Sequence, residues 1–163
     1  MIRLLVVLGE GGHTKQMLRL VELLGPGYAY HYVAVEGDGL SVARLPHPGP
    51  VHRLPRPRSK VHGRTDPLWR AAWNTLRCTW RALGVVRKVR PHAILGAGPA
   101  VSVPVSLVGK ALGARVIHVE SASRVRGLSR TGRILYPVAD LFFVQWEGLR
   151  ERYPRAIYAG RLW

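Results

Sequence analysis

Acidic residues are scarce in this sequence, which has 9 of them against 25 Lys and Arg among 163 residues, for a formal net charge of +16. The shortage is deepest between Arg44 and Arg115, where Asp66 is the one acid. Such a positive field attracts phosphates, whether in nucleic acid, in anionic lipid headgroups or in a diphosphate substrate. Charge alone does not choose among these three kinds of partner.

Cysteine and long apolar runs are also nearly absent. The single cysteine, Cys78, excludes a disulfide framework within the chain and a cysteine-based metal cluster. The longest uncharged window, residues 91–109, is interrupted by prolines and glycines, which suit a strand-turn-helix unit better than a membrane span. No signal peptide is visible, so we expect a cytosolic chain without a transmembrane segment.

The sequence instead alternates apolar runs with segments of helical periodicity. The predicted strands are 3–8, 30–35, 51–54, 92–95, 115–120 and 140–145. The predicted helices are 14–24, 68–90, 101–112 and 147–153, with Thr14 capping the first and 36–67 otherwise read as loop. This order favours one Rossmann-like α/β domain over residues 1–163, with a doubly wound parallel sheet. Its ligand would bind at the carboxyl ends of the strands.

Two glycine-rich turns follow predicted strands. Gly9, Gly11 and Gly12 lie in GEGGHT after the first strand, and Gly96 and Gly98 lie in GAGP after a later one. Glycines there let backbone N–H groups approach an anion at a helix N-terminus. Two such turns at one edge of a sheet match a diphosphate better than either turn alone.

The first turn by itself leaves alternatives open. A dinucleotide fingerprint reads G-x-G-x-x-G, but Thr14 occupies the third glycine position, so Glu36 or Asp38 supports that interpretation only weakly. A P-loop is excluded because no G-K-[ST] follows. A purely structural turn, with His13 capping the helix, is about as well supported by this turn as an anion site.

The predicted helix at 68–90 has three distinct faces at 100° per residue. A small apolar face, suited to packing on the sheet, comprises Ala71, Cys78, Ala82, Val85 and Val89. A Trp/Leu stripe comprises Trp69, Trp73, Leu76, Trp80 and Leu83, and a basic stripe comprises Arg70, Arg77, Arg81 and Lys88. Tryptophans beside arginines are typical of a helix lying on anionic headgroups. We favour this membrane interpretation over core tryptophans or base stacking.

The segment from Glu120 reads ESASRVRGLSRTGRILYPVADLFFVQWEGLRERYPRAIYAGRLW. Together with GEGGHT and GAGPAVSVP, it closely resembles the acceptor-binding, membrane-associated subunit of the two-subunit UDP-sugar glycosyltransferases, over nearly the whole chain. That family includes the anchor subunit of the eukaryotic dolichol-diphosphate N-acetylglucosamine transferase and bacterial relatives of the PssD and CpsF type. The resemblance implies the N-terminal, acceptor half of a MurG-like GT-B fold, with the donor half on a separate chain.

The same resemblance implies the partners. These are a donor-binding glycosyltransferase subunit, a polyprenyl-diphosphate sugar acceptor and an anionic membrane surface, with no nucleic acid, no cofactor and no metal. Eukaryotic members carry an N-terminal transmembrane anchor and this sequence starts on its first strand, so we expect peripheral attachment at the cytoplasmic face of the membrane. Leu162 and Trp163 would contact the partner chain. A non-catalytic membrane scaffold and a basic nucleic-acid-binding domain are the alternatives.

Residue roles at the two turns follow from the resemblance as well. An inverting sugar transfer needs a general base, for which His13 is the first candidate and Glu120 the second, with His118 expected in the core or behind the site. Backbone amides of Gly11, Gly12 and Gly98 would hold the diphosphate. The predicted substrate contacts are Gly9, Gly11, Gly12, Thr14, Gly96, Gly98, Ser123, Arg124 and Arg126, with Arg56, Arg58 and Lys60 as further charge partners.

Overall fold

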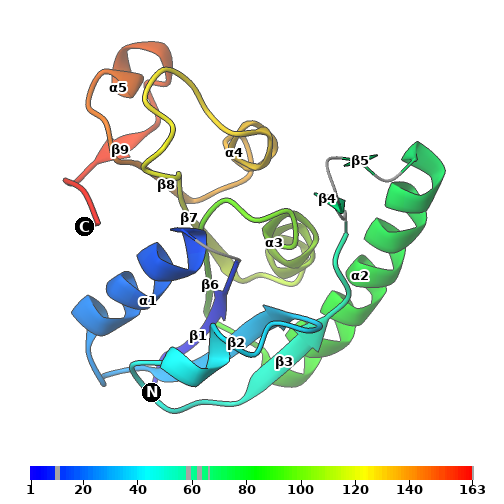
Figure 1. Ribbon diagram of the computed structural model, residues 1–163. Helices are drawn as coiled ribbons and strands as arrows, with labels where there is room; N and C mark the ends of the chain where they lie inside the picture. Colours follow the sequence, from blue (N-terminus) through cyan, green and yellow to red (C-terminus); the bar gives the residue numbers. More distant parts are fainter. Residues whose placement is uncertain (10–11, 58–59, 62–63, 66, 163) are drawn as a thin grey trace.

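The structure, a computed structural model, describes residues 1–9, 12–57, 60–61, 64–65 and 67–162 (Figure 1). Its strands are β1 (Arg3–Val7), β2 (Ala29–Val35), β3 (Val51–Leu54), β4 (Lys60–Val61), β5 (Arg64–Thr65), β6 (Ala93–Gly96), β7 (Arg115–Val119), β8 (Leu141–Val144) and β9 (Ile157–Tyr158). Its helices are α1 (Gly12–Leu24), the 3-10 helix η1 (Val42–Arg44), α2 (Leu68–Val89), α3 (Ser102–Ala111), α4 (Arg130–Leu135) and α5 (Leu149–Arg152).

Seven parallel strands form one sheet in the order β3-β2-β1-β6-β7-β8-β9. The strand order reverses between β1 and β6, which pair side by side with Val7 opposite Gly96. In open parallel sheets the ligand crevice lies at such a reversal, outside the carboxyl ends of the strands. The topology therefore brings the two glycine-rich turns to the same edge, as the sequence predicted.

Helices cover the two faces of the sheet unequally. Alternate residues of β1 face opposite ways, so that Leu4 and Val6 pack with Met17 of α1, whereas Leu5 packs with Cys78 of α2. Right-handed crossovers place α2 and α3 together on one face, and α1 lies on the other (Figure 1). The α1 face is thus covered only over the β1 half of the sheet.

Several local details differ from the sequence-based expectations. Helix α1 begins at Gly12, so Thr14 lies inside the helix and its hydroxyl donates to the Gly9 carbonyl instead of capping. Within 36–67, predicted as loop, the chain forms η1 and a β4–β5 hairpin. Helix α5 is shorter than the predicted 147–153, because only 149–152 is helical.

Helix α4 has no counterpart among the predicted elements. Ser129 caps it, accepting a hydrogen bond from the Gly132 backbone N–H at 2.9 Å. The sequence of this short helix has no clear helical periodicity and contains Gly132, so the sequence did not predict a helix in this basic segment. In the part of the chain that the structure describes, no helix is long and apolar enough to cross a membrane.

Candidate functional site

The two glycine-rich turns touch each other at the edge of the sheet. Gly98 adopts a left-handed φ of +70°, and a Cβ placed on it would lie 2.6 Å from the His13 Nδ1 atom. Only glycine fits there, because the imidazole of the first turn packs directly on the backbone of the second. A Cβ placed on Gly9 would lie 3.1 Å from the Pro99 Cβ atom, so the N-terminal ends of α1 and α3 open onto one rim. Gly12 is exposed on this rim, whereas Gly11 lies outside the described residues.

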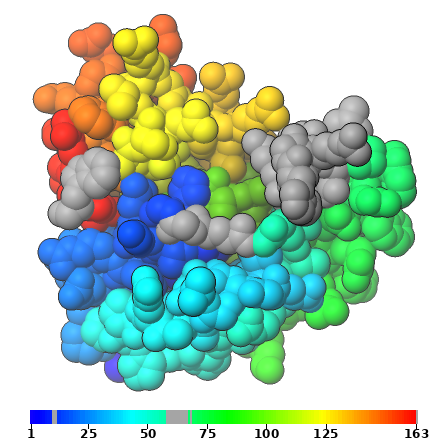
Figure 2. Space-filling view, viewed as in Figure 1, coloured from blue at the N-terminus to red at the C-terminus, as the bar shows by residue number. Residues whose placement is uncertain are grey.

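His13 is half-buried at this rim, and its environment sets its protonation. Burial lowers the pKa of His13 below its ordinary 6.5, the Glu120 carboxylate partly offsets this, and the Arg124 guanidinium lowers the pKa further. Glu120 and Arg124 are therefore both within electrostatic reach of His13. In Figure 2 the blue first turn and the yellow region around residue 120 meet on one face of the molecule. The imidazole is neutral at pH 7 and able to accept a proton.

Glu120 is fully buried and its carboxylate braces the loop that follows β7. Its Oε1 atom accepts a hydrogen bond from the Ser121 N–H at 2.8 Å, and its Oε2 atom accepts from the Ser129 N–H at 2.9 Å and the Ser129 hydroxyl at 3.1 Å. A side chain at Gly132 would collide with the Oε2 atom. This carboxylate holds both ends of the 121–129 loop and does not face solvent, a geometry that favours positioning over proton transfer.

The 121–129 loop carries the predicted polar contacts toward solvent. Ser123, Arg124 and Arg126 are exposed, and the Ser123 hydroxyl lies 3.0 Å from that of Ser121. Thr14 and Gly96, in contrast, are buried under the turns, where the Thr14 hydroxyl is engaged by the Gly9 carbonyl. Of the other predicted cations, Arg56 is exposed and Lys60 lies in β4, whereas Arg58 falls outside the described residues.

His118 lies behind the rim and is 1% exposed. Burial, with a smaller contribution from the charge of His13, lowers the pKa of His118 to about 4. Its ring packs 4.9 Å from that of Phe142, and neither ring nitrogen has a hydrogen-bond partner among the described residues. His118 is thus a neutral core residue at physiological pH. No three His, Cys, Asp or Glu side chains gather as metal ligands in the described ranges.

The Trp/Leu stripe of α2 faces solvent. Trp69, Trp73 and Trp80 are 68%, 60% and 76% exposed, and the guanidinium of Arg70 lies 5.3 Å from the Trp69 ring. The basic stripe is exposed as well, at Arg70, Arg77, Arg81 and Lys88. On the opposite side of the helix, Cys78, Ala82 and Val89 of the small apolar face are buried, and so is the neighbouring Val86, whereas Ala71 and Val85 are partly buried. The core-tryptophan alternative is therefore wrong for this helix.

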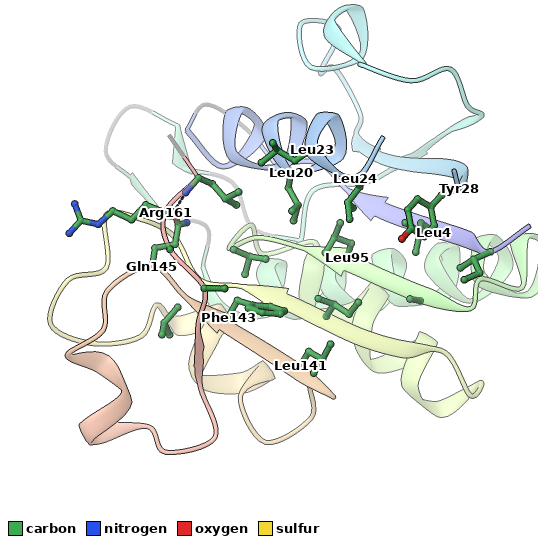
Figure 3. A pocket seen from close by; sticks show the side chains of 18 residues that line it. Leu4, Leu20, Leu23, Leu24, Tyr28, Leu95, Leu141, Phe143, Gln145 and Arg161 are labelled. Atoms are coloured by element: carbon green, nitrogen blue, oxygen red, sulfur yellow. Dashed lines mark hydrogen bonds between the residues drawn. The ribbon is translucent and has the colours of Figure 1, made fainter. Parts of the chain in front are cut away.

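A second apolar surface lies on the bare half of the sheet, where it forms a groove of about 570 Å³ (Figure 3). Alternate side chains of β6, β7 and β8 form its floor, with Leu95, Ile117 and Phe143 among them. Leu20 and Leu23 of α1 form one wall, and the 159–162 segment closes one end. Leu162, a predicted partner contact, lies in this groove, whereas Trp163 is outside the described residues.

The sequence did not predict this groove. Apolar residues on both faces of a strand indicate burial on both sides, but only the strand order shows that no helix of the described chain covers this face.

The fold and the rim together define the class: a Rossmann-like domain of the kind that forms the N-terminal half of GT-B glycosyltransferases.

Solved structures agree with this class at the level of the fold. MurG of Acinetobacter baumannii superposes with a TM-score of 0.71 at 19% identity, covering 89% of this chain and 42% of the MurG chain. The UDP-GlcNAc 2-epimerase of Methanocaldococcus jannaschii superposes with a TM-score of 0.69 at 18% identity, covering 98% of this chain and 46% of that one. The chain thus spans less than half of the length of each of these two proteins.

Sequence comparison identifies the family. The model of the family described as "Oligosaccharide biosynthesis protein Alg14 like" matches residues 4–162, and the chain belongs to this family. The UDP-N-acetylglucosamine transferase subunit ALG14 of Rattus norvegicus is 34% identical over 98% of this chain and 82% of its own length. The subunit of the same name from Schizosaccharomyces pombe is 35% identical over 96% of this chain and 81% of its own length.

Proposed function

We propose that this chain is the acceptor-binding subunit of a heteromeric UDP-sugar glycosyltransferase that acts in polysaccharide or lipid-linked oligosaccharide synthesis. Its acceptor is a sugar linked to a polyprenyl diphosphate. One observation carries the proposal: two helix N-terminal turns converge on one rim, with His13 packed on Gly98 and Arg124 within electrostatic reach. Backbone amides and a guanidinium suit a diphosphate, and the relatives named as UDP-N-acetylglucosamine transferase subunits support the sugar chemistry.

In the proposed reaction His13 is the general base. Its neutral imidazole takes the proton of the acceptor hydroxyl while that oxygen attacks the anomeric carbon of the UDP-sugar. The new carbon–oxygen bond forms as the bond to the UDP oxygen breaks, and UDP leaves with the electron pair. Glu120 holds the 121–129 loop and, through its charge, partly restores the basicity that burial removes from His13.

The α2 stripe supports a peripheral position at the cytoplasmic membrane face. Three exposed tryptophans match the depth of lipid headgroups, and the adjacent arginines match their phosphates. A polyprenyl-linked acceptor is itself anchored in the bilayer, so a subunit that lies on the membrane keeps its rim near the diphosphate.

The groove on the bare sheet face supports recruitment of the donor-binding chain. It is apolar, and Arg161 is the one charged residue among those that line it. Exposed apolar patches of this kind mark protein interfaces. Relatives of this chain are named as transferase subunits, which supports a second chain as the source of the half that binds the UDP-sugar.

The decisive experiment removes His13 in the reconstituted two-chain complex. We expect His13→Ala to lower kcat about 10²–10⁴-fold with partner binding unchanged, because the general base is lost. Wild-type kcat/KM should fall as pH drops through the His13 pKa, which lies below 6.5 in the chain without substrate, since acid protonates the base. Turnover is measured with a panel of UDP-sugars and a short-chain polyprenyl-diphosphate N-acetylglucosamine acceptor.

His92→Ala is the matched control, since His92 lies at the opposite end of the sheet, where its Nδ1 atom accepts the Arg3 N–H at 3.0 Å. Full turnover in His13→Ala would remove the base and leave the chain as a membrane scaffold for the partner. Salt-sensitive binding to polynucleotides at least as strong as to anionic vesicles would instead support the nucleic-acid alternative.

A further inference from the structure

Two neighbouring residues at the end of β8 each bridge the groove and the acceptor rim. Gln145 and Trp146 both contact the 159–162 segment on one side and the backbone after β7 on the other. In Figure 3 Gln145 and Arg161 lie together at the end of the groove. No part of the transfer chemistry proposed above uses either residue.

Gln145 forms the first bridge and is 2% exposed. Its Oε1 atom accepts a hydrogen bond from the Leu162 N–H at 2.9 Å, and its Nε2 atom donates to the Glu120 carbonyl at 3.0 Å. Both ends of one planar carboxamide are therefore engaged. A buried hydrogen bond of this kind is costly to leave unmade, so a shift of Leu162 is transmitted to the Glu120 backbone.

Trp146 forms the second bridge. The Arg161 guanidinium stacks 3.7 Å from the centre of its ring, and its indole N–H donates to the Ala122 carbonyl at 2.6 Å. Ala122 is the second residue of the 121–129 loop, whose two ends the Glu120 carboxylate already holds. Both bridges thus start at the segment that lines the groove. The first ends at Glu120, directly before the loop that carries Arg124, and the second ends at Ala122 within that loop.

We propose that Gln145 and Trp146 are positioning residues that couple the groove to the rim, so that a partner chain seated in the groove tightens binding of the acceptor diphosphate. This inference rests on the proposed function. Without the partner, the 159–162 segment has solvent on its groove side, and Arg161 is exposed. A partner packed on Leu162 fixes that segment and, through the two bridges, the 121–129 loop. By thermodynamic linkage the acceptor then tightens partner binding by the same factor.

The test measures the affinity of a short-chain polyprenyl diphosphate for the chain alone and for the two-chain complex. We expect the complex to bind at least about fivefold more tightly in the wild type, in the usual range of coupling between sites. Gln145→Glu keeps the acceptor atom for Leu162 but loses the donor to Glu120, and Trp146→Phe keeps the ring for Arg161 but loses the N–H. Each variant should reduce the ratio of affinities to less than about twofold.

Tyr158→Phe is the control, since it removes a polar hydrogen from a neighbouring aromatic residue that belongs to neither bridge. Thermal midpoints of all variants exclude unfolding as the cause of a lost ratio. An unchanged ratio in Gln145→Glu and Trp146→Phe overturns the inference, as does a wild-type ratio of one. If the wild-type ratio is one but the chain still binds the partner and the diphosphate, the proposed function stands and only the coupling is overturned. A wild-type chain that binds neither the partner nor the diphosphate overturns both the coupling and the proposed function.

Discussion

The α2 stripe and the sheet groove are both exposed apolar surfaces, but they differ in shape and in charge. The stripe runs along the outside of a helix, with Trp69, Trp73 and Trp80 beside a line of arginines. The groove is recessed between α1 and the sheet, and Arg161 is its one charged lining residue. Exposed apolar area alone therefore does not identify a partner. Flanking cations favour a lipid surface, whereas a recessed apolar groove with a single charged lining residue favours another protein.

The largest predicted effect concerns His118, behind the rim, because acid should lower the stability of the fold on which both surfaces depend. The pKa of His118 is about 4 in the folded chain, where the ring is buried, and it has its ordinary value of 6.5 in the unfolded chain. Between these values the unfolded chain binds a proton that the native chain does not. The free energy of unfolding should therefore fall as pH drops from 6.5 to 4, and the contribution of His118 to this fall should be about 3 kcal/mol.

Replacing the imidazole tests this assignment. His118→Phe cannot titrate, so its free energy of unfolding should lose most of that slope, as measured by urea denaturation at pH 7 and pH 4.5. His92→Ala, at the exposed far end of the sheet, should keep the wild-type slope. If His118→Phe retained the full pH dependence, the acid sensitivity would arise elsewhere.

The next effect separates the groove from the stripe. Leu23 is 60% exposed in the wall of the groove, so Leu23→Asp should fold normally yet bury an unpaired carboxylate under the partner. We expect partner affinity to fall at least about thirtyfold, or about 2 kcal/mol, in isothermal titration calorimetry. Binding to anionic vesicles should not change.

Leu112→Asp is the matched control, since Leu112 is similarly exposed, at 46%, and lines neither the groove nor the stripe. Equal partner affinity in Leu23→Asp and wild type would mean that the donor-binding chain docks on another face.

The smallest effect concerns the α2 stripe, where a substitution should weaken vesicle binding and leave partner binding unchanged. Trp73→Ala should lower the affinity for vesicles containing anionic lipid about tenfold, because one indole no longer enters the headgroup region. Vesicle co-sedimentation measures the loss, and partner binding should remain at the wild-type value. Trp73→Phe should keep most of the affinity. If Trp73→Ala lost partner binding but kept vesicle binding, the α2 stripe would be the partner interface and not the membrane surface.

Local sequence signals predicted much of the fold and of the rim. Apolar runs and glycine turns placed six of the seven strands of the sheet within a few residues but missed β9. The 100° periodicity of α2 separated its buried face from its exposed tryptophans. Helix α4 was missed because its stability comes from the Ser129 cap and the Glu120 carboxylate, which lies ten residues earlier in the chain. Sequence spacing does not reveal such a contact.

Glu120 illustrates the same limit at the site. Its position at the end of β7 suggested a catalytic base, yet the folded chain surrounds the carboxylate with amide and hydroxyl donors from Ser121 and Ser129. The burial of a polar group depends on which distant segments fold over it.

The sequence by itself determined the α/β class, the two N-terminal helix turns and the amphipathic face of α2, because each depends on residues close together in the chain. Only the tertiary structure decided that His13 packs on Gly98, that one half of a sheet face stays open, and that Gln145 and Trp146 join the groove to the rim. Those features follow from strand order and from contacts between distant segments, which no local pattern specifies.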